Sequence, residues 1–344
     1  MLQTSSVNRR LARVASSAAT FAAVMFVTAA VHAAPPLEDS ATAVQIAATL
    51  EPDDTLGDVL DHPALDGFAE YVLPWYGRHT DRSLPLTRIG SLLPYHSAVD
   101  SDVVAAGLDR LIENAARGVP VFQPIYSEAE RRADPALAAA GLFFFPGEPG
   151  APFAIIAPGG GFSYVGSVHE GFPVALEINA QGYNAFVVTY RTGLGGGPAT
   201  EDMARAIDLI MTRANALDVS PVGYSVWGSS AGARMAASIG SHGTAAFGGA
   251  DHEKPAAVVM AYTAHADIGR DEPPTFVVVG TRDAIAPPSA MERRIARLRA
   301  MGTEVEYRLV PGVGHGFGTG AGTPAERWVG DAMAFWKRQL DRSR

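Results

Sequence analysis

The sequence VWGSSAGAR at residues 226–234 places two adjacent serines, Ser229 and Ser230, between two glycines. A β-prone run, 225–227, leads into it, and an alanine-rich stretch with helical spacing, 231–241, follows it. Ser230 is the centre of the pattern Gly-x-Ser-x-Gly, whose small residues let a strand and a helix approach closely around a strained turn. The pattern predicts that Ser230 is a nucleophile displayed at a strand end and that Ser229 is structural.

Short apolar, β-prone runs alternate with helical patterns from residue 119 onward. Such alternation is typical of an α/β fold with a mostly parallel sheet covered by helices on both faces. The predicted strands are 141–145, 153–157, 185–190, 225–227, 257–262, 276–280 and 305–310, and the predicted helices are 169–181, 200–217, 231–241, 289–301 and 325–340. Because sites in these sheets form at the C-terminal ends of strands, the residues just after each strand are the candidates for chemistry.

The sequence PGGGF at residues 158–162 directly follows one predicted strand. Glycines let backbone N–H groups turn toward a substrate oxygen with no Cβ in the way. Enzymes with this nucleophile turn take one such donor from a loop of this kind and one from the residue after the nucleophile. We therefore expect Gly160, Gly161 and Ala231 to form an oxyanion hole, the alternative being a flexible turn.

An acid and a histidine follow the last two predicted strands. Asp283 comes shortly after 276–280, and His315 comes shortly after 305–310. Ser230, Asp283 and His315 stand in a chain order known for serine–histidine–acid triads, so we predict that they form one. Asp267, which follows the strand at 257–262, is the rival for the acid.

With these motifs, the chain resembles the α/β-hydrolase superfamily in its esterase and lipase branch. The resemblance covers residues 119–344 and rests on the serine turn, the glycine loop, GTRDAIAP at 280–287 and GHGF at 314–317. Pro158 stands where many relatives have the histidine of His-Gly-Gly-Gly. In this respect the chain is similar to acetyl-esterase and feruloyl-esterase-like members.

The resemblance implies a serine esterase that cleaves carboxylic esters of small or medium acyl groups through an acyl-enzyme. A small-molecule ester is the expected partner, and neither a metal nor an organic cofactor is expected. An amidase or peptidase would use the same triad, and a non-catalytic binding protein can share the fold. These two alternatives stay open at the level of sequence.

Four further residues near the predicted strand ends are candidates for substrate binding, with core packing or structural hydrogen bonds as the alternative: Phe162, Tyr164, His169 and His265. Glu170, at the start of the next predicted helix, is expected to favour that helix N-terminus. The glycine-rich run at 193–197 lacks dinucleotide-loop spacing, and we interpret it as a mobile loop.

Residues 1–33 differ from the rest, with Arg9, Arg10 and Arg13 ahead of an apolar, alanine-rich run that ends in Val31-His32-Ala33. This is the pattern of a cleaved signal peptide, so we expect an exported protein, periplasmic or secreted, without a stable membrane anchor. An uncleaved anchor is the alternative, and the arginine pair leaves a twin-arginine route open. Losing these three arginines would take the formal net charge from −9 to about −12, which disfavours nucleic acid. The absence of cysteine excludes a disulfide scaffold.

Residues 34–118 match no motif and are predicted to be a mostly helical extension of the hydrolase part, 119–344. Helices are expected after Asp54-Thr55 through Leu60, over 64–75 and over 103–116. Trp75, Tyr76 and Tyr95 lie in a segment broken by Pro and Gly. The extension is expected to be a cap that encloses substrate with these aromatics, or else to pack against the sheet edge.

Overall fold

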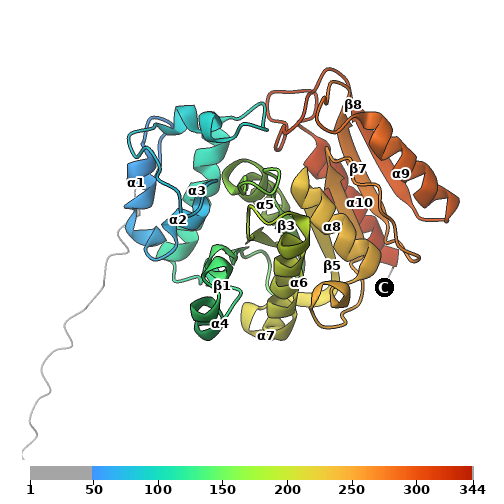
Figure 1. The fold of residues 1–344 in the computed structure, drawn as a ribbon, viewed down its shortest axis with the longest axis horizontal. Helices are drawn as coiled ribbons and strands as arrows, with labels where there is room; N and C mark the ends of the chain where they lie inside the picture. The colour runs from blue at the N-terminus through green and yellow to red at the C-terminus, as the bar shows by residue number, and fades with distance from the viewer. Residues whose placement is uncertain (1–48, 343–344) are drawn as a thin grey trace, which may run out of the picture. The chain divides into compact units, whose positions relative to one another are not determined.

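An eight-stranded sheet organises the chain in the computed structural model, which describes residues 49–342 (Figure 1). The strand order is β1-β2-β4-β3-β5-β6-β7-β8. β2 runs antiparallel to both of its neighbours, β1 and β4, whereas all the strand pairs from β4 to β8 are parallel. The strands are β1 (Phe122–Pro124), β2 (Gly141–Phe145), β3 (Pro152–Ala157), β4 (Asn184–Thr189), β5 (Ser220–Ser229), β6 (Ala257–Ala261), β7 (Thr275–Gly280) and β8 (Val305–Val310). The predicted signal peptide lies outside the described residues.

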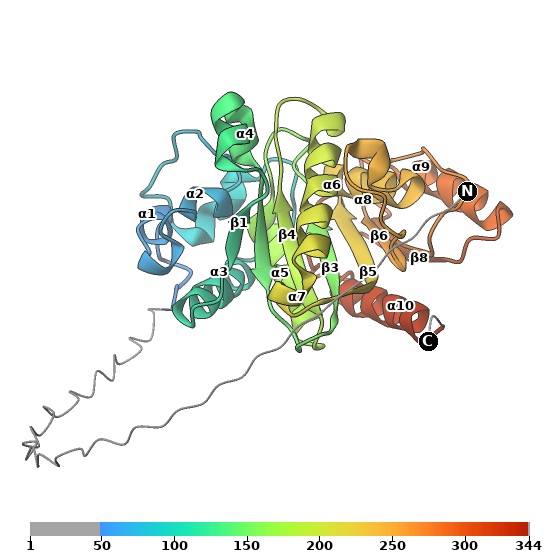
Figure 2. The same cartoon turned by 90° about the horizontal axis from the view of Figure 1, so that it is seen from below.

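Helices cover both faces of this sheet, as the apolar strands require (Figure 2). One buried core joins the sheet to α3 (Ser101–Ala116), α5 (Phe172–Asn179) and α10 (Trp328–Arg342). The other joins it to α6 (Gly196–Thr212), α8 (Ala231–His242) and α9 (Pro288–Ala300). The α/β fold with a mostly parallel sheet is therefore confirmed. No helix among residues 49–342 has the length and apolar character needed to cross a membrane.

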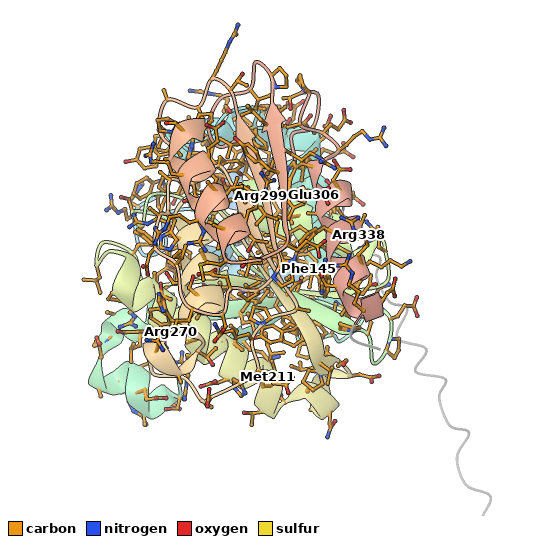
Figure 3. All side chains as sticks on the ribbon, turned by 90° about the vertical axis from the view of Figure 1, so that its right-hand side faces the viewer. Phe145, Met211, Arg270, Arg299, Glu306 and Arg338 are labelled. Carbon is orange, nitrogen blue, oxygen red and sulfur yellow. The ribbon has the colours of Figure 1, made fainter. Side chains whose placement is uncertain are left out.

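The edge strand β8 carries charges instead of a continuous apolar run. Glu306 pairs with Arg308 of the same strand at 2.5 Å and with Arg338 of α10. Glu306 and Arg338 are labelled in Figure 3. Arg308 also contacts Asp331 at 3.1 Å. Charged side chains on an edge strand oppose pairing with another chain, so this edge is protected against aggregation.

The N-terminal segment, residues 49–118, is built from short helices. They are α1 (Leu56–Leu60), η1 (Pro63–Leu65), α2 (Ala69–Val72), η2 (Leu86–Leu92) and α3. Thr55 caps α1 in a capping box with Asp58, as the sequence predicted for this start. The single helix predicted over 64–75 is wrong, because Gly67 takes a φ of +81° and separates η1 from α2.

Two other helix predictions and one loop prediction needed correction. The helix predicted over 200–217 breaks at Arg213 into α6 and α7 (Ala214–Leu217). The helix predicted from His169 begins at Phe172, after a π-helical turn, η4 (Ser167–Gly171). The run at 193–197 is not wholly a loop, because α6 begins inside it at Gly196. Between β1 and β2 the chain adds α4 (Glu128–Ala133) and η3 (Pro135–Ala139), and η5 (Ala245–Phe247) follows α8.

Candidate active site

Ser230 occupies a strained turn between β5 and α8. Its φ of +49° and ψ of −113° lie where residues with a side chain are rarely found, and its N–H donates to the Ala261 carbonyl at 2.9 Å. A Cβ on Gly232 would lie 1.8 Å from the Ala157 carbonyl oxygen. A Cβ on Gly228 would lie 2.3 Å from the Gly232 backbone. Only glycine fits at either position, which is the steric reason for the Gly-x-Ser-x-Gly spacing.

Ser230, His315 and Asp283 form a continuous hydrogen-bonded chain. Ser230 Oγ lies 2.8 Å from His315 Nε2, and His315 Nδ1 lies 2.8 Å from Asp283 Oδ2. The other Asp283 oxygen accepts N–H donors of Ile285 at 2.9 Å and Ala286 at 2.7 Å. His315 and Asp283 are buried, at 8% and 4% exposure, whereas Ser230 is half-buried. The geometry suits a hydroxyl whose proton can pass to a held imidazole.

Asp267, the rival acid, lies elsewhere. Its carboxylate is exposed and contacts His242 Nε2 at 2.7 Å. That histidine belongs to the C-terminal end of α8, whereas Ser230 precedes its N-terminus. The structure therefore brings Asp283, and not Asp267, to His315.

The glycine loop after β3 presents backbone N–H groups beside Ser230. Gly160 has φ +132° and Gly161 has φ +63°, and a Cβ on Gly160 would lie 2.1 Å from the Tyr164 carbonyl oxygen. Among residues 49–342, the N–H groups of Gly160 and Gly161 meet no acceptor. Ala231 starts α8, so its N–H belongs to the unpaired first turn of that helix. These three donors are available for an anionic oxygen.

Glu170 is a completely buried carboxylate directly behind this loop. Its Oε2 accepts the Gly159 N–H, and its Oε1 accepts the Tyr262 hydroxyl at 2.8 Å. His96 Nε2 lies 2.9 Å from Oε1, close enough for the imidazole and the carboxylate to pair. Burial acts to raise the pKa of Glu170, but His96, His169 and the Gly159 N–H outweigh it and lower that pKa to about 2.

Sequence patterns missed this role of Glu170 and missed His96 altogether. Glu170 was predicted to favour a helix N-terminus, but it lies in the π-helical turn η4 and turns inward. His96 lies in the irregular segment after η2, where no motif marks it. The only available signal was a His-Glu pair shortly after a glycine loop.

The four residues predicted to bind substrate occupy different environments. Phe162 is buried against Tyr190 and beneath the Arg234 guanidinium, which lies 5.7 Å from its ring centre. Tyr164 and His169 are buried, at 1% and 4% exposure, so their side chains support the loops. Tyr164 accepts the Tyr95 N–H at 3.2 Å, and His169 Nε2 lies 3.0 Å from the Gly316 carbonyl.

His265 is half-buried and lines a cavity of about 400 Å³ together with Arg234, Ala264, Ala266 and Asp267. Burial lowers the pKa of His265, and the charges of Arg294 and Arg234 lower it further, to about 4. Arg234 lies one helical turn after Ser230, but neither Ser230 nor His315 lines this cavity. His265 lines this cavity, whereas the other three predicted residues, Phe162, Tyr164 and His169, do not.

Exposed apolar side chains lie next to the glycine loop and to Asp283. They are Tyr95, Leu194 and Ile285, at 43%, 57% and 57% exposure. A Cβ on Gly161 would lie 2.9 Å from the Tyr95 ring, so this ring covers the loop. The Gly193 N–H donates to the Phe162 carbonyl at 2.7 Å, and this places the next residue, Leu194, beside the glycine loop. These side chains expose an apolar surface beside the glycine loop and Asp283.

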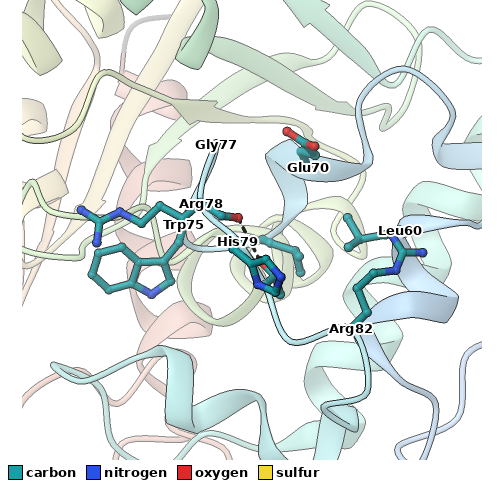
Figure 4. A pocket seen from close by; sticks show the side chains of 9 residues that line it. Leu60, Glu70, Trp75, Gly77, Arg78, His79 and Arg82 are labelled. Atoms are coloured by element: carbon teal, nitrogen blue, oxygen red, sulfur yellow. Dashed lines mark hydrogen bonds between the residues drawn. The ribbon is translucent and has the colours of Figure 1, made fainter.

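A second cavity, of about 240 Å³, lies within the N-terminal segment (Figure 4). Arg78 stacks on Trp75 with 4.6 Å to the ring centre. The other polar residues that line the cavity are Glu70, His79, Thr80 and Arg82. Neither Ser230 nor His315 lines this cavity, so we do not assign it to the chemistry. Among residues 49–342, no group of three or more potential ligating side chains could hold a metal ion.

Comparison with solved structures identifies the fold. An α/β-hydrolase enzyme, MGS-M1, from a deep-sea metagenome library superposes with a TM-score of 0.52 and 23% identity over 59% of this chain and 93% of its own. The chain has the α/β-hydrolase fold. An acetyl ester-xyloside bifunctional hydrolase from Caldicellulosiruptor lactoaceticus has a TM-score of 0.55 and 20% identity over 63% of this chain and 95% of its own.

Two sequence comparisons agree with this α/β-hydrolase fold. The model of the prolyl oligopeptidase family matches residues 259–343, which hold Asp283 and His315. An acetylxylan esterase of Xylanibacter ruminicola is 29% identical over 97 residues, 28% of this chain. The match spans only 20% of that relative's length.

Proposed function

We propose that the protein is a serine hydrolase that cleaves carboxylic esters of small or medium acyl groups. The observation that carries the proposal is the chain from Ser230 Oγ through His315 to Asp283, with 2.8 Å at each step. The three side chains come from loops after three different strands, and they meet at the edge where parallel sheets form their sites.

In the proposed reaction, Ser230 Oγ bonds to the ester carbonyl carbon while its proton passes to His315 Nε2. The tetrahedral oxyanion accepts the N–H groups of Gly160, Gly161 and Ala231, and losing one such donor typically costs about 3 kcal/mol of barrier. The carbon–oxygen bond to the alcohol then breaks as His315 returns the proton to the leaving oxygen. Water then attacks the carbonyl carbon of the acyl-enzyme and gives its proton to His315. The bond to Ser230 breaks as His315 returns the proton to Ser230 Oγ, and the acid is released.

The named relatives support an ester substrate. The sequence relative is an acetylxylan esterase, and the structural neighbours include an esterase from Thermogutta terrifontis with TM-score 0.50 and 18% identity. The prolyl oligopeptidase family model favours a second candidate, a peptidase or amidase that uses the same triad. Matched p-nitrophenyl acetate and p-nitroacetanilide distinguish the two candidates, because only an amidase turns over both.

The test is hydrolysis of p-nitrophenyl esters of increasing acyl length by the wild type, Ser230→Ala and Ser229→Ala. We expect Ser230→Ala to lose activity by about 10⁶-fold, with only the residual catalysis that the oxyanion donors and binding provide. Ser229→Ala should keep activity within about fivefold of the wild type, because the buried Ser229 side chain contacts Tyr262 and not His315. Full activity in Ser230→Ala would refute the proposal. Absence of fluorophosphonate labelling in the wild type would favour a binding protein instead.

We also propose that the protein acts outside the cytoplasm, after cleavage of residues 1–33. The support is the arginine-led apolar run that ends in Val31-His32-Ala33. N-terminal sequencing of the full chain expressed in a bacterium should read from Ala34 in the exported fraction. An intact N-terminus in the membrane fraction would favour the anchor instead.

A further inference from the structure

Glu170 connects parts of the site that are far apart in sequence. Its side chain is 0% exposed, and its contacts come from the glycine loop, from the residue after β6 and from the N-terminal segment. A buried carboxylate is costly unless it is paired and hydrogen-bonded, and one partner alone would not compensate Glu170. The groups around it are therefore held in a defined arrangement.

On one side, Glu170 restrains the glycine loop against the nucleophile. Gly159 lies between the two, because a Cβ built there would be 2.8 Å from Glu170 Oε2 and 2.9 Å from Ser230 Cβ. The Gly159 N–H donates to Oε2, so this residue does not offer its own N–H to a substrate. The next two N–H groups, of Gly160 and Gly161, find no acceptor among residues 49–342.

On the other side, Glu170 restrains the loop that carries His315. Tyr262, whose hydroxyl donates to Oε1, has its ring centre 5.2 Å from that of His315 in an edge-to-face contact. It also lies 4.4 Å from the ring centre of Phe317 in the same loop. Tyr262 takes a φ of +36°, a strained value for a residue with a large side chain. The surrounding contacts must hold it there.

The N-terminal segment supplies the remaining contacts. His96 Nδ1 lies 2.8 Å from the Tyr164 hydroxyl, and its side chain is 1% exposed. Ser97 donates its hydroxyl to the His315 carbonyl at 2.6 Å and its N–H to the Gly316 carbonyl at 2.9 Å. The segment thus contacts the backbone of the catalytic histidine itself.

We propose that Glu170 and His96 are positioning residues for the hydrolysis, and that the N-terminal segment completes the active site through them. The pair sets the glycine loop and the His315 loop relative to Ser230, and neither side chain touches the substrate. This inference rests on the proposed function, since it concerns the same triad and the same oxyanion donors.

The decisive variant is Glu170→Gln, which keeps the side chain's shape and removes its charge. We expect kcat per active site for p-nitrophenyl acetate to fall about 10- to 100-fold, because small displacements of reacting groups cost that much. KM should stay within about threefold. His96→Asn should lower kcat in the same way. The double variant should lose little more than Glu170→Gln alone, because the two residues act as one unit.

Two matched controls come from the same regions of the chain. Glu177→Gln makes the identical change on α5, seven positions later, away from the triad. His79→Asn makes the identical change at an exposed histidine of the N-terminal segment (Figure 4). Both should keep the wild-type kcat per site.

Active sites are counted by stoichiometric fluorophosphonate labelling, and folding by thermal unfolding. If Glu170→Gln and His96→Asn reduce the number of sites but keep the wild-type kcat per site, the pair only supports the fold and the proposal is overturned. If the wild type labels but hydrolyses no ester, the proposed function fails separately. The rate of labelling then replaces kcat, and equal rates in wild type and both variants would overturn the inference. A wild type that neither labels nor hydrolyses overturns both.

Discussion

Asp283 uses its two oxygens for different purposes, and this makes an asparagine substitution informative. Oδ1 accepts the N–H groups of Ile285 and Ala286, whereas Oδ2 faces His315 Nδ1. In Asp283→Asn, the amide oxygen should keep the two backbone donors, which leaves the NH₂ group pointing at His315. The imidazole must then accept at Nδ1 and carry its proton on Nε2, where it cannot take the Ser230 proton.

We therefore expect Asp283→Asn to lower kcat for p-nitrophenyl acetate roughly 10³- to 10⁴-fold with the fold intact. Asp267→Asn, at the exposed rival acid, should stay within about twofold. Steady-state kinetics of the two variants side by side give the comparison. An equal loss in both, or a loss only in Asp267→Asn, would mean that the acid is misassigned.

At the scale of elements, glycines decide how closely α8 approaches the sheet. Gly232→Ala would put a Cβ 1.8 Å from the Ala157 carbonyl oxygen, and backbone cannot yield cheaply there. We expect a loss of about 3 kcal/mol or more in the free energy of unfolding. Urea unfolding measures it, and a Gly232→Ala protein as stable as the wild type would contradict this packing.

Gly330→Ala is the matched control for this prediction. Gly330 is an exposed residue of α10, and a Cβ there would have no atom within 4 Å. Alanine should stabilise the protein by about 0.5–1 kcal/mol, since glycine is entropically costly in a helix. The two substitutions are chemically identical. Opposite changes in the free energy of unfolding would therefore isolate the effect of the close approach between α8 and the Ala157 carbonyl.

Sequence patterns located best the helices and strands whose apolar residues recur at a regular spacing or that have a motif at each end. Predictions of β2 to β7 held because each strand contains a short apolar run buried in the sheet. β8 was located by its β-prone Val, Tyr and Leu residues, although most of it is not buried. β1 was missed because three residues are too few to show a repeating apolar pattern. The helix predicted over 64–75 was wrong because the apolar spacing was given more weight than Gly67.

The same limit applies to the site. Ser230, Asp283 and His315 stand in motifs after strands, whereas His96 is placed by tertiary contacts that leave no local pattern.

At the scale of the whole molecule, stability should depend on pH through a partly buried carboxylate. Burial, and then the charge of Glu326, raise the pKa of Glu177 to about 7 from its usual 4.5. Below pH 4.5 the folded and unfolded states both hold the proton, so Glu177 costs nothing. As pH rises from 4.5 through 7, the unfolded state releases the Glu177 proton before the folded state does. The folded state therefore loses stability relative to the unfolded state over this range.

We therefore expect Glu177→Gln to have the same unfolding temperature as the wild type near pH 4 and a higher one at pH 8. Thermal unfolding across this pH range, followed by circular dichroism, provides the measurement. A difference that is constant with pH, or largest at pH 4, would contradict the raised pKa.

The contact between Ser97 and the His315 carbonyl joins residues 218 positions apart. A ribosome adding about 5–20 residues per second needs roughly 10–45 s to travel that distance. For this whole interval the chain already contains the N-terminal segment but lacks His315. If His315 activates Ser230 as proposed, newly made protein is chemically silent until residue 315 has been added, and a chain released before then would carry a serine with no activity.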